Sequence, residues 1–341
     1  MARLVPVLRA VSLAARRDAR SAGSIATNNF FLATALFLQR AGAFVFLLLG
    51  VILLFPLSAD PLRRVPPERL ALWPLSAGQR RLLRLAAPWL SWPAWAMAVL
   101  IALALRRNVS LGFVALFAAI AAGGFAVSLI PDARKQGIFR PVPAAPGRFG
   151  ELVRNHLRQM LSTLDFYAAL LLASCAAAYR LISGGTPPEM NQAMTILTLL
   201  ALSSHALCLF GLDGRQGFLR YHLLPVRGWR LLLAKDAAFL AVAVLLALPL
   251  APLPGLAGAL AALAIGNFPS VREFREQVRW RFSTGSSIGA GLLQVFAITS
   301  AAVTTDREGP WVALLCAAAL AGSLWYCGRL LDAPGSAIAD Q

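Results

Sequence analysis

The sequence predicts an all-α fold, a polytopic transmembrane helical bundle with helices lying at the cytoplasmic surface. Hydrophobic residues make up 58% of the 341 residues, charged residues make up 14%, and the mean hydropathy is +0.68. An ordinary soluble domain is about 25% charged, so this chain has too few charges to cover a water-exposed surface. Apolar runs long enough to cross a bilayer as helices recur along the chain. Lipid is therefore the expected solvent for much of the surface.

About nine segments have the length and composition of membrane spans. They lie near 41–57, 86–105, 109–130, 166–182, 190–212, 237–253, 255–268, 287–304 and 311–331. Pro252, Pro254 and Gly255 break the apolar run between the sixth and seventh spans. Both of these spans are short, which is typical of a broken or re-entrant segment.

These spans divide the chain into four predicted regions. Residues 1–130 form an N-terminal membrane region of about three spans, and 131–165 form a cytoplasmic linker with an interfacial helix. Residues 166–331 form a six-span core, and 332–341 form a C-terminal tail.

Basic residues alternate with the spans. The segments 58–85, 131–165, 213–236 and 269–286 hold 21 Lys and Arg, whereas the other connectors between spans hold three. Because cytoplasmic loops carry an excess of Lys and Arg, we expect these four loops and the C-terminus in the cytoplasm. The net charge of +17 is then explained by topology, and we expect no nucleic-acid partner.

The N-terminal region leaves two alternatives open. Residues 1–27 carry five arginines and are expected inside, yet one long apolar run separates them from the next basic loop. A charge at the bilayer centre costs roughly 2.5–3.5 kcal/mol, so Arg40 is expected at an interface or a turn. Either residues 28–57 form a hairpin that turns near Gln39 and Arg40, or they lie partly in the interface. The span count changes by one between these alternatives.

Residues 148–165 predict a helix lying on the membrane surface. Apolar residues recur every three or four positions, and polar residues take the opposite face, a pattern that suits the headgroup boundary. The apolar stripe comprises Phe149, Leu152, Val153, Leu157, Met160, Leu161 and Leu164, and the polar face Arg154, Asn155, Arg158 and Gln159. The alternative is a solvated linker with accidental periodicity.

Residues 216–235 predict two short amphipathic pieces on either side of Pro225, at the cytoplasmic surface. This segment combines basic residues with runs of leucine, and Trp229 suits a membrane interface. Residues 72–84 have a similar order of leucine, Pro74, small and polar residues, arginine and paired leucines. The two copies indicate a structural repeat, or else the common composition of short interfacial loops in a Leu- and Arg-rich protein.

The segment 209–236 resembles permeases of type 2 ATP-binding-cassette exporters. In that family an acid- and glycine-containing turn ends the second core span, and a leucine-rich stretch with proline, arginine and lysine leads into the third. Ala264-Ile265-Gly266-Asn267 also resembles a family feature, and the layout of 148–331 fits. The resemblance covers a little over half of the chain, and residues 1–130 depart from a plain six-span permease.

The resemblance implies a coupling helix that contacts a separate ATPase subunit, and a second permease subunit as homo- or heterodimer partner. The implied contact residues are Asp213, Gly214, Gly217, Leu224, Pro225, Val226, Arg227, Arg230, Leu232, Leu233 and Lys235. Pro74, Arg80 and Arg81 of the weaker copy are candidates for a second contact.

The chain contains no phosphate-binding Gly-x-x-x-x-Gly-Lys-Ser/Thr loop. We therefore expect ATP to be bound by a partner, no cofactor or metal in this chain, and no enzymatic activity of its own. Ser203, Ser204 and His205 lie within the fifth predicted span, where a polar cluster marks either a transport pathway or a hydrogen bond between helices. The alternatives to a permease are a membrane scaffold or assembly protein and, less favoured, a lipid-modifying enzyme.

Overall fold

The computed structural model describes residues 4–17, 62, 72–87, 142, 146–182, 188–214, 217, 221, 226–273 and 288–333. These residues form helices and turns, with no strand among them. The chain divides into two compact units, Met1–Gly23 with Phe37–Lys135 and Ser24–Leu36 with Gln136–Gln341. The prediction of an all-α chain is confirmed for the described part.

Two helices are described in the first unit, α1 (Leu4–Arg17) and α6 (Ala77–Ala86). The α6 helix begins with a reciprocal cap, in which the Ser76 hydroxyl accepts from the Gln79 amide and the Gln79 side chain accepts from the Ser76 amide. Val11 of α1 and Leu83 of α6 share a small apolar cluster with Leu75. The cluster holds these two amphipathic helices together.

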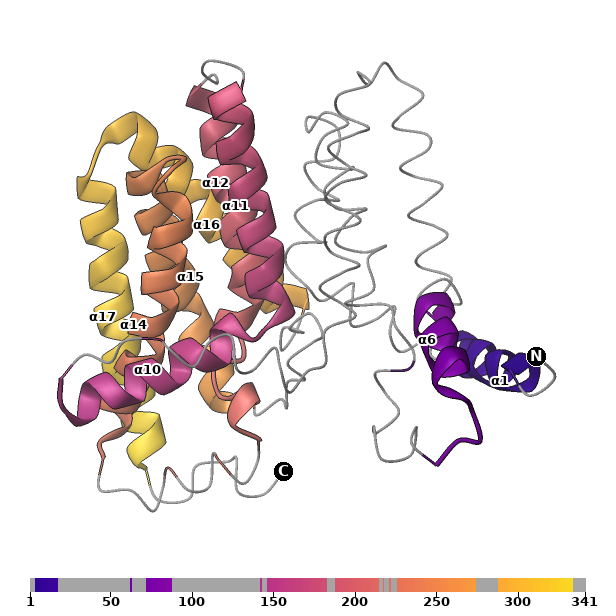
Figure 1. Cartoon of the computed structure of the whole chain (residues 1–341). Helices are drawn as coiled ribbons and strands as arrows, with labels where there is room; N and C mark the ends of the chain where they lie inside the picture. The colour runs from indigo at the N-terminus through magenta and orange to yellow at the C-terminus, as the bar shows by residue number, and fades with distance from the viewer. Residues whose placement is uncertain are drawn as a thin grey trace. The chain divides into compact units, whose positions relative to one another are not determined.

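The second unit is a helical bundle with one helix across its end (Figure 1). Its helices are α10 (Gly147–Leu161), α11 (Leu164–Ile182), α12 (Pro188–Ala206), α14 (Gly228–Ala247), α15 (Pro252–Arg272), α16 (Ile288–Glu308) and α17 (Trp311–Asp332). The α15 helix packs against α12, α14, α16 and α17. We call the end of the bundle crossed by α10 the foot, and it includes the start of α14 and the end of α17.

A sharp corner separates α10 from α11. The two helices meet at 76° across a break at Ser162 and Thr163. The Ser162 hydroxyl donates to the Gln159 carbonyl at 2.6 Å and the Thr163 hydroxyl to the Met160 carbonyl at 2.7 Å, so both side chains satisfy carbonyls at the end of α10. Sequence analysis predicted one surface helix through residue 165, whereas the surface helix ends at Leu161 and Asp165 already belongs to α11.

Small residues let α15 approach its neighbours closely. A Cβ at Gly266 would lie 2.5 Å from the Ala206 carbonyl oxygen, and one at Gly258 would lie 2.7 Å from Leu199 Cδ1. Close backbone approach through glycine is a common device for packing apolar helices. The glycines of α15 therefore fix its distance from α12.

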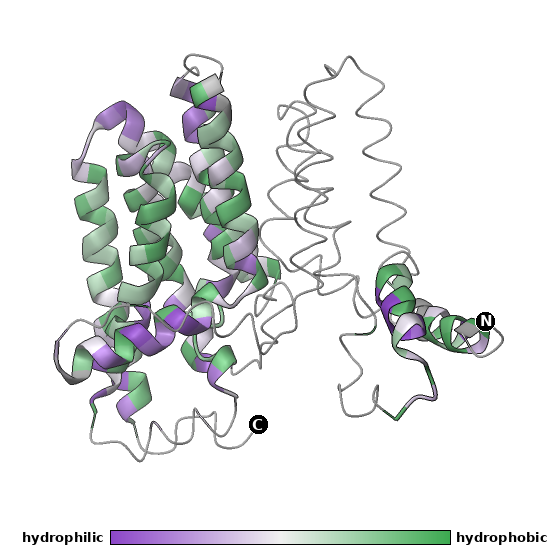
Figure 2. Ribbon diagram, in the orientation of Figure 1, coloured by the Kyte–Doolittle hydropathy of each residue, from purple (hydrophilic) through white to green (hydrophobic). Residues whose placement is uncertain are grey.

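Three described helices, α15, α16 and α17, are long and apolar enough to cross a membrane. The bent pair α10–α11 is a fourth candidate if its two arms are taken as one broken span. Figure 2 shows the bundle helices mostly hydrophobic, with hydrophilic residues at their ends and along α10. The prediction of membrane-crossing helices is confirmed at this level, and the count of nine stays a prediction.

The boundaries of the sixth and seventh predicted spans differ from the structure. The α14 helix starts at Gly228 and ends at Ala247, and α15 runs through 21 residues from Pro252. Pro252 and Pro254 lie in the first turn of α15, where a proline costs no backbone hydrogen bond. The apolar run is therefore broken just before Pro252, close to where the break was predicted, and the prolines start a full-length helix rather than a short one. The first three predicted spans lie almost wholly outside the described residues.

Candidate functional site

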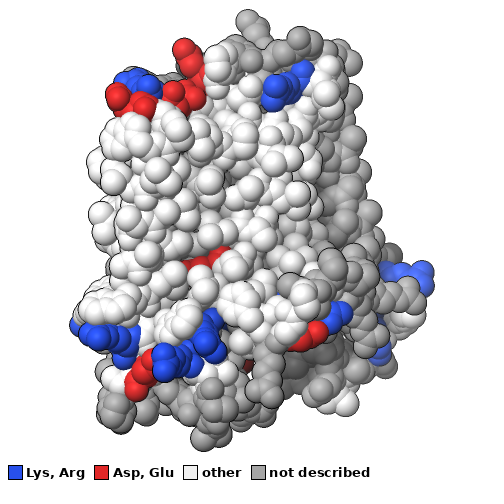
Figure 3. All heavy atoms as spheres, turned by 90° about the vertical axis from the view of Figure 1, so that its left-hand side faces the viewer, with Lys and Arg blue, Asp and Glu red and all other residues white. Residues whose placement is uncertain are grey.

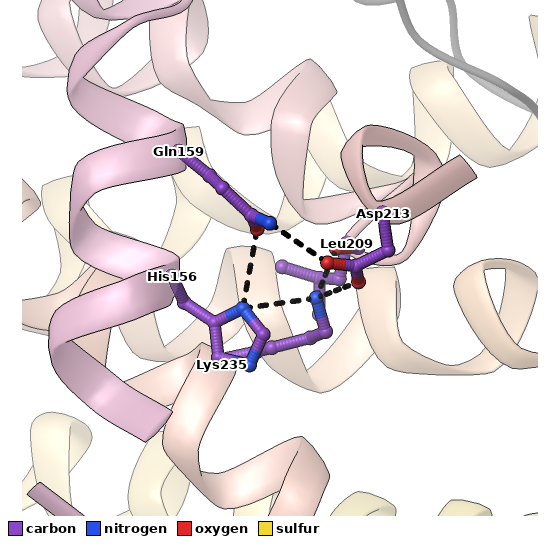
Figure 4. Close-up of polar contacts among 5 residues, drawn as sticks. All are labelled: His156, Gln159, Leu209, Asp213 and Lys235. Carbon is purple, nitrogen blue, oxygen red and sulfur yellow. Dashed lines mark hydrogen bonds and ion pairs between the residues drawn. The ribbon is translucent and has the colours of Figure 1, made fainter. Parts of the chain in front are cut away.

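The foot of the bundle contains a buried polar cluster around Lys235 of α14 (Figure 4). The Lys235 ammonium donates to Asp213 Oδ2 at 2.7 Å and to the Leu209 carbonyl at 2.8 Å, and its Nζ lies 3.2 Å from His156 Nδ1. An ammonium has three donors, so these three contacts use all of them. The Nζ atom also lies 4.8 Å from the centroid of the Phe210 ring, a favourable cation–π distance.

Both carboxylate oxygens of Asp213 have hydrogen-bond partners. Gln159 of α10 donates to Oδ1 at 2.9 Å, while Lys235 donates to Oδ2. Burial alone raises the pKa of Asp213, but the charge and hydrogen bond of Lys235 and the amide of Gln159 outweigh it, so the pKa is lowered overall. Asp213 is therefore ionised at neutral pH, and its oxygens are already engaged by protein donors rather than free for a metal ion.

The chain between α12 and α14 is shaped to place Asp213. After α12 ends, a turn and a short 3-10 helix (Gly211–Asp213) carry the backbone to the cluster. The Asp213 amide donates to the Phe210 carbonyl at 3.1 Å, and Gly214 follows with a φ of 68°. Glycine adopts this left-handed conformation without a steric cost. The glycine after the acid thus takes a backbone conformation beside the ion pair that a larger residue would adopt only with strain.

His156 of α10 is neutral, and its Nδ1 lies 3.2 Å from the Lys235 ammonium and 3.3 Å from Gln159 Oε1. An ammonium only donates, so the contact with Lys235 requires Nδ1 to be the acceptor. The ring proton is then on Nε2, which has no hydrogen-bond partner, and Gln159 Oε1 is a second acceptor beside Nδ1. Burial first, and then the positive charge of Lys235, lower the pKa of His156 to about 3. The cluster thus ties α10 to α14 through a neutral imidazole.

The start of α14 is clamped against the end of α17. A Cβ at Gly328 would lie 2.6 Å from Trp229 Cβ, and one at Gly228 would lie 2.8 Å from the Gly328 carbonyl oxygen. The Gly228 amide donates to Asp332 Oδ1 at 2.6 Å, so an acid at the end of α17 caps the start of α14. The two glycines make room for this contact, because any larger side chain would separate the helices.

The predicted contact residues differ in their exposure to solvent. Arg227 and Arg230 are exposed, whereas the side chains of Asp213 and Lys235 are almost fully buried. Leu232 is buried in an apolar cluster with Phe210 and Leu331. Gly214, Gly217, Val226 and Leu233 are half-buried, and Leu224 and Pro225 lie outside the described residues. The exposed pair is thus available to a partner, and the buried residues hold that pair in place.

The interpretation of 216–235 as two short amphipathic pieces needs a correction. Its second half, from Gly228 to Lys235, is the first part of the continuous helix α14. The apolar residues Leu231 and Leu232 continue into the apolar face of that helix, so no break separates the surface segment from the bundle.

The candidate contact residues of the weaker copy, in segment 72–84, also lie at the protein surface. Pro74, Arg80 and Arg81 are exposed, and the Arg80 guanidinium donates to the Leu75 carbonyl at 3.1 Å. Both α6 and α14 begin three residues after the proline of their copy, Pro74 or Pro225. The local resemblance therefore extends to the start of a helix, while the caps differ, since α6 uses Ser76 and α14 uses the distant Asp332.

Ser203, Ser204 and His205 are buried in the last turn of α12, next to the cluster. The Ser203 hydroxyl donates to the Leu200 carbonyl of its own helix at 3.0 Å. A small cavity is lined by His156, Gln159, Leu209, Lys235 and His205. The structure thus brings His205 beside the ion pair at the foot of the bundle rather than to the middle of a helix.

Sequence analysis missed His156 and Gln159. Gln159 was assigned to the solvent-facing side of α10, yet it binds Asp213, and His156 is buried. A signal existed, because His156 follows Val153 by three positions and precedes Met160 by four, which places it on the apolar stripe.

Comparisons with protein-family models, with curated proteins and with solved structures gave no match to this chain. The class of protein is thus defined by its own features: the described part of the chain is all-helical, with membrane-crossing candidate helices and a buried ion pair at the foot of the bundle.

Proposed function

We propose that this chain is the membrane-spanning permease subunit of an ATP-binding-cassette exporter in a bacterial cytoplasmic membrane. A separate ATPase subunit docks at the foot of the bundle, and a second permease subunit completes the transport path. The observation that carries the proposal is the buried Lys235–Asp213 pair, because it joins the predicted coupling segment rigidly to the bundle.

The surface of the bundle supports the membrane part of the proposal. Charged side chains gather at the two ends of the face in Figure 3, and the band between them is almost free of them. At the foot, the Arg329 guanidinium carbon lies 4.2 Å from the Trp325 ring centroid, and that of Arg272 lies 4.6 Å from the Phe268 ring centroid. Aromatic and basic side chains of this kind suit a headgroup interface.

The connectivity of the foot supports the coupling part. A force applied to the exposed Arg227 and Arg230 acts directly on the start of α14, because α14 continues unbroken into the bundle. Lys235 passes that force to α10 through His156 and, through Asp213, to the chain that follows α12. A contact at the foot thereby acts on α14, on α10 and on the turn after α12 together.

Affinity purification in mild detergent, with identification of the co-purifying chains and an ATPase assay, tests the proposal. We expect a co-purifying chain with a phosphate-binding loop, lost from the doubly substituted Arg227→Glu, Arg230→Glu variant. Arg307→Glu is the matched control, since Arg307 is an exposed arginine at the end of α16.

Two results would contradict the proposal. One is a chain that purifies alone without ATPase activity, which would favour the scaffold or the enzyme. The other is an ATPase that co-purifies equally with both charge-reversed variants, which would place its contact elsewhere. Retained insertion and yield of the variants, measured in the same membranes, separates lost docking from lost folding.

A further inference from the structure

A second buried polar pair lies beside the cluster, between Asp236 of α14 and Asn267 of α15. Both side chains are fully buried, at 0% exposure, and the Asn267 amide donates to Asp236 Oδ2 at 3.0 Å. Asp236 is next to Lys235 in sequence, yet the two side chains bind different parts of the protein, Lys235 contacting α10 and Asp236 contacting α15.

Two oxygen atoms of this pair have no hydrogen-bond partner, Asp236 Oδ1 and Asn267 Oδ1. An ionised carboxylate in a buried site needs several donors or a cation to offset its lost hydration. Asp236 has a single neutral donor, and the nearest ammonium, that of Lys235, has already committed its three donors elsewhere. A charge on Asp236 would therefore be almost uncompensated.

A proton on the Asp236 carboxyl would give both of these oxygen atoms a hydrogen-bond partner. A carboxylic acid and a primary amide form two parallel hydrogen bonds, from the amide N–H to one acid oxygen and from the acid O–H to the amide oxygen. The first of these bonds is present, and the two unpartnered oxygens are the acceptor and the proton-bearing atom of the second. Buried polar groups are satisfied in the great majority of folded proteins.

We infer that Asp236 and Asn267 form a proton-binding site, in which Asp236 takes a proton from solvent and shares it with the Asn267 side-chain oxygen at neutral pH. The shared proton links α14 to α15, and its release would leave both oxygen atoms buried without a hydrogen-bond partner. The other ionisable groups near Asp236 in the described part of the chain are Lys235 on the same helix and Cys327 of α17. The inference goes beyond the proposed function and holds without any ATPase partner.

Infrared and NMR spectra of the purified full chain in lipid nanodiscs test the site. At neutral pH we expect a protonated-carboxyl C=O band that shifts in D₂O and disappears in Asp236→Asn. The matched control, Asp306→Asn, removes an exposed acid of α16 and should retain the band. In the unsubstituted chain, carbon-13 labels on aspartate carboxyls should report at least one neutral acid, so the test does not depend on any variant folding.

The pH dependence of stability gives a second readout. An amide at position 236 preserves a neutral pair with two hydrogen bonds, so the stability of Asp236→Asn is independent of this proton. Relative to that variant, the folded-to-unfolded ratio of the natural chain should fall about tenfold per pH unit from pH ~4 up to the pH at which folded Asp236 loses its proton, because only the folded state retains the proton in this range. The absence of a protonated-carboxyl band that depends on Asp236 at neutral pH, or a pH-independent difference between the two chains, would overturn the inference and indicate a bound cation or a simple structural pair.

Discussion

The Lys235 ammonium and the Asp213 carboxylate lie 2.7 Å apart with side chains 2% and 3% exposed, although 22 residues separate them along the chain. Few ion pairs are so completely removed from water, and burial makes each charge dependent on the other. The pair holds the turn after α12 against α14 at the foot of the bundle. The contribution of this ion pair to the free energy of unfolding is therefore the first property to measure.

Removing one charge of this pair should destabilise the chain far more than removing both. Lys235→Met or Asp213→Leu alone leaves an unpaired buried charge, which costs roughly 3–5 kcal/mol. The double variant should recover a large part of that loss, which a double-mutant cycle of unfolding free energies in mixed detergent micelles would measure.

The exposed pair of Arg154 and Glu151 provides the control for this cycle. Its side chains are 28% and 64% exposed, and Glu151→Gln should change the unfolding free energy by no more than about 0.5 kcal/mol. Strictly additive losses in the Lys235 and Asp213 variants would mean that the two charges are not coupled.

His156 should make the chain less stable as the pH falls from about 6.5. Its pKa is about 3 in the folded chain against an ordinary value of about 6.5, so the unfolded chain binds more protons between these values. The contribution of His156 to the free energy of unfolding should therefore drop by about 1.4 kcal/mol per pH unit on acidification through this window and level off above it.

Relative to His156→Gln, the natural chain should lose stability on acidification from pH 6.5 to 5 in thermal unfolding curves, and this difference cancels the opposite effect of the Asp236 proton. The lowered pKa of Asp213 acts in the same direction but only at lower pH, where protonation of its carboxylate removes the ion pair. Identical slopes for the natural chain and His156→Gln would show that His156 does not control acid stability.

Gly266→Ala should destabilise the bundle by about 1–3 kcal/mol, the usual cost of overpacking. The added Cβ would meet the Ala206 carbonyl oxygen at 2.5 Å, and backbone cannot move aside as a flexible side chain does. Gly322→Ala in α17 is the matched control, because nothing lies within 4 Å of its Cβ position and alanine is the better helix former. Unfolding midpoints of both variants check the contrast, and equal effects would refute the packing argument.

Asp332→Ala should cost about 1 kcal/mol by removing the cap of α14. Asp332→Asn keeps an acceptor but loses the favourable interaction with the helix dipole, so its loss should be smaller. Hydrogen exchange of the amides in the first turn of α14 should become faster in Asp332→Ala and remain unchanged in Asp306→Ala. Unchanged protection in Asp332→Ala would mean that the cap contributes no local stability.

Composition and periodicity were sufficient to predict the helices of the second unit and most of their positions. Long apolar runs fix where a helix can lie, because the period and length of the pattern follow from helix geometry. The predicted helix ends were less accurate at Ser162 and around Pro252. There, local hydrogen bonds and the tolerance of a first helical turn for proline decide where a helix ends or begins. Neither can be extracted from average hydropathy.

The candidate site was predicted only in part. Lys235 and Asp213 were identified through a resemblance, but their direct contact depends on how α14 packs beside the turn after α12. The partners Gln159 and Asp332 lie 54 and 104 residues from the groups they bind. Side-chain partners at such separations follow from tertiary packing, and a single sequence carries no local pattern for them.

The long separation between Gly228 and Asp332 has a consequence during synthesis. A ribosome adding roughly 5–20 residues per second completes the start of α14 about 5–20 seconds before the acid that caps it exists. Throughout that interval the Gly228 amide lacks its native acceptor, and the part of α14 that packs against α17 at Gly228 is uncovered. The α17 helix is thus the last described helix to pack, and a nascent chain truncated before α17 would leave the start of α14 accessible to proteases.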